Sequence, residues 1–286
     1  MNTYTLRTNS IAQLLKREAG RQLCRSVKSF VFVATTGRSG SKTLYHLCKS
    51  ISGCASFHEP LPEMNGDILS AYNRLDDQKM LKFFKDFKLP AIYKASLNQD
   101  WYIETNHTFI KCFADAAVEE FSDRLKVVHM IRDRHEVARS WLNRGSIPGQ
   151  GAKGAWLLDP VAPRNLIQFN DLRIQDDRFN HDYLKCLWYW YEIEARIAQF
   201  KQRYPQIPVY VLKTEDLNDV NVLLPVFEKL FAGFDRSDLI KKIGSRINSS
   251  KEIPKQPRDI ERAAIDKFDT LCQSILTKRC KNEDVI

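Results

Sequence analysis

The stretch from Ser29 to Leu44, SFVFVATTGRSGSKTL, decides the fold of this chain. It begins with an apolar run over 30–34, typical of a buried strand, and continues through a loop of Thr, Gly, Arg and Ser into a segment that can be helical. Small residues let a backbone wrap closely around an anion, and the start of a helix directs unpaired N–H groups at it. Arg38 and Lys42 add positive charge at the same place. The stretch therefore predicts a strand–loop–helix unit that binds phosphate.

The loop departs from the Walker A pattern of nucleoside triphosphatases, G-x-x-x-x-G-K-[ST]. Lys42 and Thr43 occupy the positions of its Lys and Ser/Thr, but both glycine positions fail and hold Thr36 and Ser41. Such enzymes also end a strand in an Asp that holds Mg²⁺, whereas the apolar strand expected over 125–131 meets an arginine first. The chain keeps the phosphate-binding pattern without the metal-nucleotide residues. A Gly/Ser turn that binds nothing is the plainer alternative.

A second cationic position follows the strand expected over 127–131. Arg132 stands at its carboxyl end, and Ser140 lies eight residues later in a segment that can be helical. Ligands of open α/β sheets gather at the carboxyl ends of strands, so these two side chains can converge on one phosphate. Alone the spacing is weak, because a surface pair of Arg132 with Asp133 or Glu136 is the usual outcome. Together with the first loop it indicates one anion site built from two strand ends.

At this point the chain resembles the PAPS-dependent sulfotransferases. TGRSGSKTL, residues 36–44, is similar to their 5'-phosphosulfate loop. VVHMIRDRHEVARSWL, residues 127–142, is similar to their 3'-phosphate-binding strand and helix, and VYVLKTEDL, residues 209–217, to a later strand that ends in an acidic EDL. The resemblance implies a three-layer α/β sandwich of P-loop NTPase-like architecture, in which helices flank a central parallel sheet. It also implies 3'-phosphoadenosine 5'-phosphosulfate as the co-substrate.

The same resemblance implies the residues that bind this donor. They are Gly37, Arg38, Ser39, Gly40, Ser41, Lys42, Thr43, Arg132 and Ser140, joined by Ser249 and Lys251 from a later polar loop. That later loop could equally be a plain connection between helices. The first motif departs from the family at Ser41-Lys42, where Thr-Thr is usual, and the second at Arg134, where proline is usual. The first departure leaves open whether Arg38 or Lys42 contacts the transferring group.

Sulfuryl transfer, like phosphoryl transfer, is an in-line displacement in which charge builds on the leaving oxygen. Positioning and electrostatics supply most of the rate, so Arg38 or Lys42 would act catalytically by stabilising the departing bisphosphate. The resemblance implies no divalent metal, and no metal site is predicted from the sequence.

The acceptor must also lose a proton, which requires a base. Glu59, in a Phe-His-Glu-Pro run, and His107, at the end of Trp101–His107, are the two candidates, and Glu59 is favoured. His58 is a third possibility, either as the base or as a group that orients Glu59. The plainer alternatives are a helix-capping glutamate and a histidine hydrogen-bonded at a strand end.

Composition sets the outer bounds. A chain of 286 residues with 43% hydrophobic content can form one α/β domain over 1–286. Its formal charge of +9 suits an anionic nucleotide, and the cations are too scattered, without a nucleic-acid-binding motif, to predict nucleic acid as a partner. Seven widely spaced cysteines indicate reduced thiols. No apolar run has the length of a signal peptide core or a membrane span, so we expect a cytoplasmic enzyme without a transmembrane segment. The oligomeric state cannot be derived from the sequence.

The chain is organised around this domain. An N-terminal extension over 1–28 contains a weakly amphipathic helix expected to pack on the domain, and a helical part is expected over 223–286. Periodicity predicts further helices over 78–87, 110–122 and 182–203.

Glycines and prolines interrupt 143–180, which predicts a lid or acceptor-binding insert with Trp156 and Phe169 as walls. A surface excursion with its own small cluster is the alternative.

The sequence favours a sulfotransferase that moves a sulfuryl group from the donor to a hydroxyl-bearing acceptor, with a carbohydrate or another polar small molecule slightly favoured. A P-loop kinase or NTPase is the second hypothesis, and it would need an intact Gly-Lys-Thr and a magnesium-binding acid. The third is a catalytically dead nucleotide-binding module on the same scaffold, against which the two candidate bases, Glu59 and His107, argue.

Overall fold

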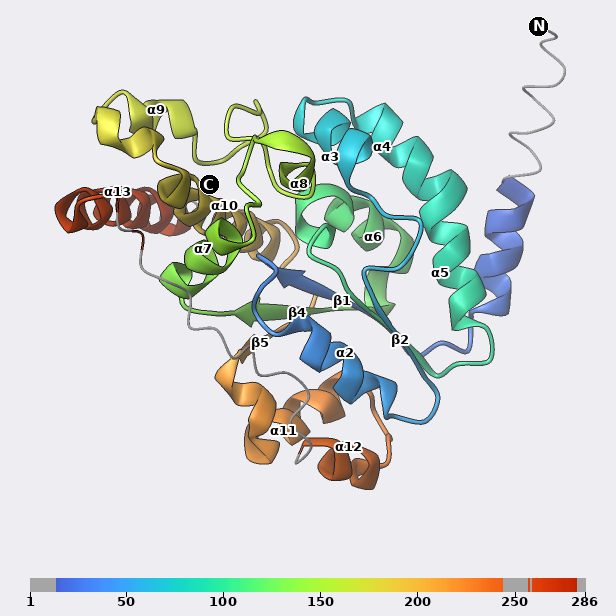
Figure 1. Cartoon of the computed structure of the whole chain (residues 1–286). Helices are drawn as coiled ribbons and strands as arrows, with labels where there is room; N and C mark the ends of the chain where they lie inside the picture. Colours follow the sequence, from blue (N-terminus) through green and yellow to red (C-terminus); the bar gives the residue numbers. More distant parts are fainter. Residues whose placement is uncertain (1–13, 244–256, 258, 282–286) are drawn as a thin grey trace, which may run out of the picture.

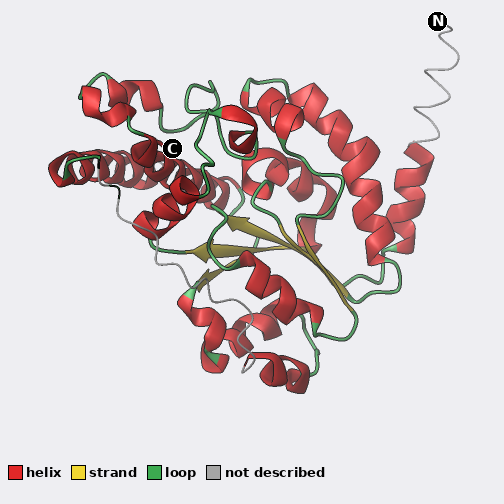
Figure 2. Cartoon of the chain, in the orientation of Figure 1, coloured by secondary structure: helices red, strands yellow, loops and turns green. Residues whose placement is uncertain are grey.

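A sheet of five parallel strands, in the order β2-β3-β1-β4-β5, forms the centre of the molecule. The computed structural model describes residues 14–243, 257 and 259–281. Its strands are β1 (Ser29–Thr35), β2 (Cys54–His58), β3 (Trp101–Thr105), β4 (Leu125–Ile131) and β5 (Val209–Lys213). Helices cover both faces of this sheet, as Figure 2 shows. The predicted α/β class with a central parallel sheet flanked by helices is therefore confirmed.

The central strand, β1, explains why the layers form. All seven of its residues are buried. Successive side chains of a strand point to opposite faces, so Phe30 and Phe32 enter the larger hydrophobic core while Val31 and Val33 enter the smaller one. A strand with apolar residues on both faces must be covered on both, which is the pattern of buried parallel sheets.

The smaller core lies under the sheet in the view of Figure 1. Its helices are α2 (Ser41–Lys49), α11 (Val220–Leu230) and α12 (Arg236–Ile243). The larger core lies on the other face, and its elements are α3 (Gly66–Asn73), α4 (Asp77–Phe83), η1 (Phe84–Lys88), α5 (Leu89–Ser96), η2 (Phe109–Phe113), α6 (Ala114–Phe121), α7 (Arg134–Asn143), α10 (Asp182–Arg203) and α13 (Arg262–Lys281). Two short 3-10 turns, η3 (Ser122–Arg124) and η5 (Glu215–Asn218), complete the connections outside the insert.

The three helices predicted from periodicity are present, two of them with shifted ends. The helix expected over 78–87 runs as α4 into the π-helical turn η1 and on through α5, and the one expected over 110–122 is the π-helical turn η2 followed by α6. The helix expected over 182–203 coincides with α10. Residues 14–23 are helical and pack on α5, where the Tyr93 ring lies 2.7 Å from the place that a Cβ on Gly20 would take.

The insert over 143–180 is more ordered than a simple loop. It contains α8 (Gly151–Gly154), α9 (Phe169–Arg173) and η4 (Asp177–Asn180). Glu192 on α10 accepts the backbone N–H groups of Leu166 and Ile167, which ties the insert to the core. Phe169 is 3% exposed and packs against Trp188 and Phe268, so the expectation that it walls the acceptor pocket is wrong. Its ring is buried because α9 folds back onto α10.

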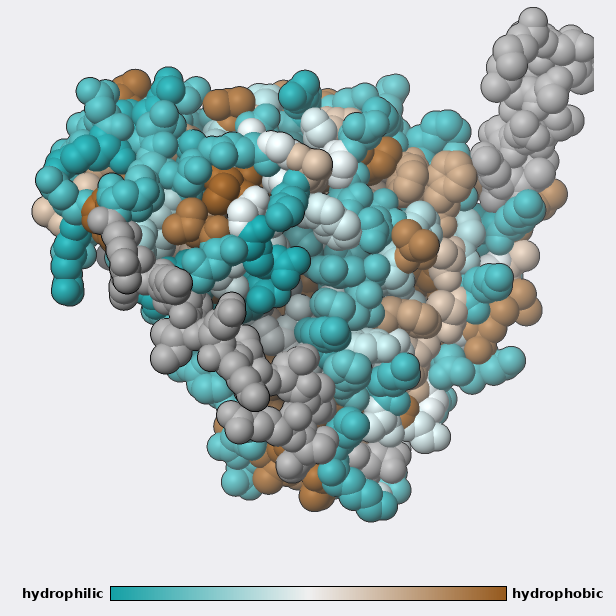
Figure 3. Space-filling view, in the orientation of Figure 1, coloured by the Kyte–Doolittle hydropathy of each residue, from teal (hydrophilic) through white to brown (hydrophobic). Residues whose placement is uncertain are grey.

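The surface carries a few further findings. No helix among the described residues is long and apolar enough to cross a membrane. Hydrophilic side chains predominate on the face shown in Figure 3, and the brown apolar side chains form small separate groups. Six cysteines are free thiols: Cys24, Cys48, Cys54, Cys112, Cys186 and Cys272. The cytoplasmic location and the lack of a nucleic-acid partner stay predictions.

Candidate functional site

The carboxyl ends of all five strands meet along one edge of the sheet, since all are parallel. The loop over 36–40 leaves β1 there, and Glu59 follows β2. His107 lies just beyond β3, Arg132 follows β4, and Thr214 follows β5. The chain leaves β1 towards the β2–β3 side and leaves β4 towards β5, so the strand order reverses beside β1. Such a switch point is where open α/β sheets bind their ligands.

The loop after β1 has a tightly curved backbone that leaves room for a group to approach closely. Gly37, Arg38 and Gly40 have positive φ angles of 71°, 60° and 89°. Glycine adopts this backbone region without cost, whereas Arg38 is strained there. α2 then begins without a side-chain cap at Gly40 and without an acidic residue in its first turn. Its first N–H groups are thus available to an anion.

Residues 214–217, which follow β5, pack against this loop. The Thr214 hydroxyl donates a 3.0 Å hydrogen bond to the carbonyl of Ser39. A Cβ on Gly40 would lie 2.6 Å from Leu217 Cδ1, so a larger residue would have to displace that buried side chain. The Ser39 hydroxyl is buried and bonded to the hydroxyl of Thr35, which fixes the loop from within. The segments 36–44 and 209–217, which both resemble sulfotransferase motifs, are therefore in direct contact.

Arg38, Arg132 and Arg144 form an arginine cluster at this loop. Arg38 Nε donates a 2.9 Å hydrogen bond to Ser140 Oγ on α7, and Arg132 Nη1 donates a 2.8 Å bond to the Arg38 carbonyl. Burial and the nearby charges of Arg144 and Arg132 lower the pKa of Arg38. Arg132 also pairs with Glu136 at 2.8 Å, the surface pair considered as its alternative role. The structure therefore brings Arg38, Arg132 and Ser140 together, with the charge of Glu59 close enough to act on Arg38.

Three more of the predicted donor residues lie on α2, directly after the loop. Ser41 and Thr43 are in the first turn of α2, which begins at Ser41. Lys42 is exposed on the same turn, and within the described part of the chain no hydrogen bond or ion pair holds it. Arg38, and not Lys42, is thus the loop cation that contacts the second motif. Ser249 and Lys251 lie outside the described residues.

The two candidate bases adjoin each other. His107 Nε2 lies 3.4 Å from Glu59 Oε1, and their side chains are 4% and 31% exposed respectively. Glu59 has a positive φ of 49°, a strained state that clusters at functional sites. Burial, followed by the charges of Lys111 and His58, lowers the pKa of His107 well below its usual value. His58 Nδ1 is hydrogen-bonded to Thr105 Oγ1 at 2.9 Å, which holds its ring against β3.

Lys111 is the main residue that sequence reasoning missed. Its Nζ lies 2.7 Å from His107 Nδ1 and also donates to the carbonyl of Trp156. The side chain is fully buried, and burial lowers its pKa well below the usual value. The signal was present in the sequence, because Lys111 is a lone cation in the apolar run over 109–113. That run forms the π-helical turn η2, a feature often found at functional sites.

Aromatic rings surround the base pair. Trp156 stacks on His107 with ring centroids 5.9 Å apart and planes 22° apart, so the predicted wall residue does face this site. Trp141 lies 6.1 Å from His107, and its Cζ2 would be 3.0 Å from a Cβ on Gly37. Trp141 Nε1 and Tyr189 Oη are buried and lack a hydrogen-bond partner among the described residues.

A buried ion pair connects the two loops that contain Glu59 and His107. Lys88 Nζ and Glu104 Oε1 are 2.7 Å apart, and both side chains are essentially inaccessible to solvent. Glu104 also accepts hydrogen bonds from Tyr102 Oη and Asn106 Nδ2, both at 2.7 Å. Lys88 further donates to the Pro60 carbonyl at 3.3 Å. The network therefore links the residue after Glu59 to the residue before His107.

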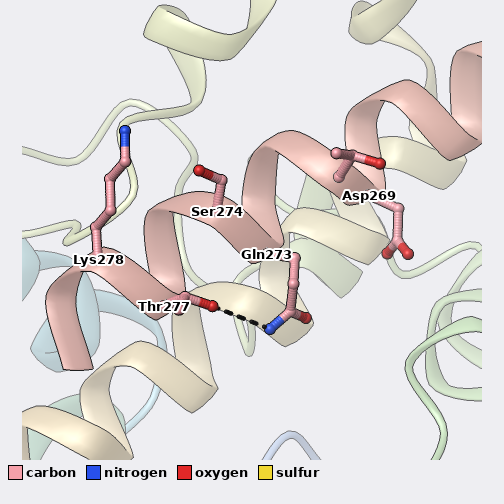
Figure 4. A pocket seen from close by; sticks show the side chains of 6 residues that line it. Asp269, Gln273, Ser274, Thr277 and Lys278 are labelled. Carbon is pink, nitrogen blue, oxygen red and sulfur yellow. Dashed lines mark hydrogen bonds between the residues drawn. The ribbon is translucent and has the colours of Figure 1, made fainter. Parts of the chain in front are cut away.

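Two surface hollows lie outside this group of residues. One, of about 550 Å³, follows α13 and is drawn in Figure 4, lined by Asp269, Thr270, Gln273, Ser274, Thr277 and Lys278. The other, of about 280 Å³, lies between α3 and the insert, and Ala155 and Leu157 on either side of Trp156 line it. Only the second hollow borders a residue that contacts a candidate base.

The arrangement combines a cluster of arginines with a carboxylate–imidazole pair. Within the described residues, no group of three or more His, Cys, Asp or Glu side chains is placed to hold a metal ion. Comparisons of the chain with protein-family models, with curated proteins and with solved structures found no match. The geometry and the sequence therefore carry the functional argument.

Proposed function

We propose that this protein is a sulfotransferase that moves a sulfuryl group from 3'-phosphoadenosine 5'-phosphosulfate to the hydroxyl of a polar acceptor. One observation carries the proposal. Arg38, just before α2, donates to Ser140 and accepts a hydrogen bond from Arg132 at its carbonyl. The charge of Glu59, which pairs with His107, acts on Arg38, and a Cβ on Gly37 would lie 3.6 Å from His107 Cγ. In this proposal the arginine cluster binds the anionic donor, and the neighbouring carboxylate–imidazole pair supplies the base.

The arginine cluster supports a donor with more than one phosphate. Like charges close together raise the energy of the protein without an anion, and the lowered pKa of Arg38 reflects that repulsion together with burial. An anion at this point would remove the repulsion and gain charge-assisted hydrogen bonds. The α2 N-terminus would take the 5'-phosphosulfate, while Arg132 and Ser140 would take the 3'-phosphate.

The reaction then needs few groups. An acceptor oxygen forms a bond to sulfur while the bond from sulfur to the 5'-phosphate oxygen breaks, and the bisphosphate leaves. The acceptor proton passes to Glu59 or His107. Arg38 and the N–H groups of the loop stabilise the negative charge that develops on the leaving oxygen. The chemistry requires these groups to be positioned before the acceptor binds.

The surroundings of the bases favour a polar, ring-shaped acceptor. Trp156 and Trp141 offer ring faces and edges near His107, and Trp141 Nε1 and Tyr189 Oη are unpaired polar groups there. Apolar faces combined with a few hydrogen-bonding groups are the usual lining of small-molecule sites. A carbohydrate hydroxyl suits this lining, and the hollow between α3 and the insert offers room for the rest of the acceptor.

Thermal unfolding tests the proposal without knowledge of the acceptor. We expect 3'-phosphoadenosine 5'-phosphate, without metal, to raise the melting temperature. At 100 times its Kd a ligand of the native state adds about 2.7 kcal/mol. For a chain of this size that corresponds to roughly 5–10 °C. A shift with Mg-ATP alone would replace the proposal with a kinase or NTPase, and a shift with neither would favour a scaffold that has lost its nucleotide site.

The kinase alternative has one structural observation against it. Asp133, the first acid after β4, accepts the backbone N–H of Glu136 at 2.9 Å as the cap of α7. The acid that would hold Mg²⁺ in an NTPase is thus engaged in starting a helix.

A further inference from the structure

The hydrogen bonds of His107 decide which candidate base is free to act. Both ring nitrogens have a close polar neighbour, with Lys111 Nζ 2.7 Å from Nδ1 and Glu59 Oε1 3.4 Å from Nε2. The two nitrogens of a neutral imidazole differ, since one carries a proton and the other a lone pair. The neighbours therefore determine where the proton lies.

The contact with Lys111 favours an unprotonated Nδ1 on the His107 ring. Lys111 donates one hydrogen to the Trp156 carbonyl, which can only accept. As an ammonium group it has only donors to offer to Nδ1 as well. As a neutral amine it still has a second hydrogen for that nitrogen. In either state Nδ1 can accept from Lys111.

The Nε2 side independently requires a proton. An ionised carboxylate only accepts hydrogen bonds, so an unprotonated Nε2 would set two acceptors against each other. With the proton on Nε2, the imidazole instead donates towards Glu59. The 3.4 Å separation is long for a hydrogen bond, as is common at catalytic pairs before substrate binds.

Resting on the proposed sulfuryl transfer, we propose that Lys111 is a positioning residue that fixes His107 in its Nε2–H tautomer and so aims it at Glu59. His107 then has no free nitrogen to take a proton. Glu59, whose side chain is 31% exposed against 4% for His107, is left as the general base that accepts the proton of the acceptor hydroxyl. The buried His107 and Lys111 hold its carboxylate at the edge of the loop.

Nitrogen NMR on the intact protein with ¹⁵N-labelled histidine tests this directly. The chain has six histidines, and the signals lost in His107→Gln assign this ring. We expect a neutral His107 with the proton on Nε2 in the wild type at pH 7. In Lys111→Met, which keeps the apolar stem and removes the amine, we expect that single form to be lost.

A second lysine–histidine contact supplies the matched control. Lys201 Nζ, in the last turn of α10, lies 3.3 Å from His129 Nδ1 on β4. Lys201→Met should shift the signals of His129 and leave those of His107 unchanged.

The wild-type spectrum alone can overturn the proposal, even if Lys111→Met does not fold. A proton on Nδ1, or a doubly protonated ring at pH 7, would make His107 available as the base or show that Lys111 does not set its tautomer. An Nε2–H tautomer that persists unchanged in a folded Lys111→Met would also remove Lys111 from this role. The bisphosphate melting experiment is separate: its failure would remove the sulfuryl reaction, while the tautomer result would report on Lys111 alone.

Discussion

Replacing Arg132 with alanine removes one guanidinium from the proposed donor site while leaving β4 intact. Arg132 follows the last residue of β4, is 25% exposed and donates a 2.8 Å hydrogen bond to the Arg38 carbonyl. The substitution removes a cation that can reach the bound anion and also loosens the loop that holds Arg38. Both effects should weaken binding of 3'-phosphoadenosine 5'-phosphate.

The size of the effect follows from the kind of contact. A hydrogen bond to a charged group contributes about 1.5–3 kcal/mol. Each 1.4 kcal/mol is about a factor of ten in affinity, so the Kd should rise roughly 10- to 150-fold. The pairing of Arg132 with Glu136 and its partial exposure favour the lower part of this range, because solvent screens such charges.

Isothermal titration of the bisphosphate into each variant measures the change. Arg134→Ala is the matched control, since Arg134 lies two residues further on and is held by Asp269 through two hydrogen bonds of 2.7 and 2.6 Å. It should lower the melting temperature without changing the Kd. An unchanged Kd in Arg132→Ala, or an equal loss in both variants, would refute the assignment of Arg132 to the donor site.

Three other predictions follow from the same geometry. Gly40→Ala should lower the melting temperature more than Gly233→Ala and should also abolish bisphosphate binding. The two glycines have similar φ angles, 89° and 86°, but of the two only Gly40 would place its new Cβ closer than 3 Å to another atom. Equal melting temperatures of the two variants would contradict this steric argument. Lys88→Met should destabilise the fold by about 3–5 kcal/mol in urea, because it leaves Glu104 as a buried unpaired charge, and a loss below about 1 kcal/mol would show that the carboxyl becomes neutral at little cost. The pKa of His107 is lower in the folded protein than in the unfolded chain. As the pH falls below about 6.5, the unfolded chain therefore binds a proton that the folded protein does not. In this pH range the free energy of unfolding should decrease by up to about 1.4 kcal/mol per pH unit. In His107→Gln this slope should be shallower, and identical urea-derived slopes in the two proteins would contradict the buried neutral imidazole.

The site could be predicted in part because part of it is local. The loop after β1 consists of consecutive residues, so its pattern can be recognised directly in the sequence. Arg132 and Ser140 can be recognised because one follows a strand and the other lies in the helix that comes next. Their positions relative to the sheet follow from parallel strand order alone. Phe169 was misjudged because an aromatic ring in a Gly- and Pro-rich stretch can face either a ligand or the core, and its packing partner Phe268 lies far along the chain.

The sequence alone was enough to predict the α/β class, and it allowed the loop after β1 and the candidate bases Glu59 and His107 to be named. These depend on alternation, on small residues and on positions at strand ends, which act over a few neighbouring residues. Only the tertiary structure decided that Arg38 contacts Ser140, that Lys111 is buried against His107 and that Trp156 covers that ring. Such contacts join separate elements, and burial sets the charge and direction of a side chain, so both depend on how the helices pack on the sheet.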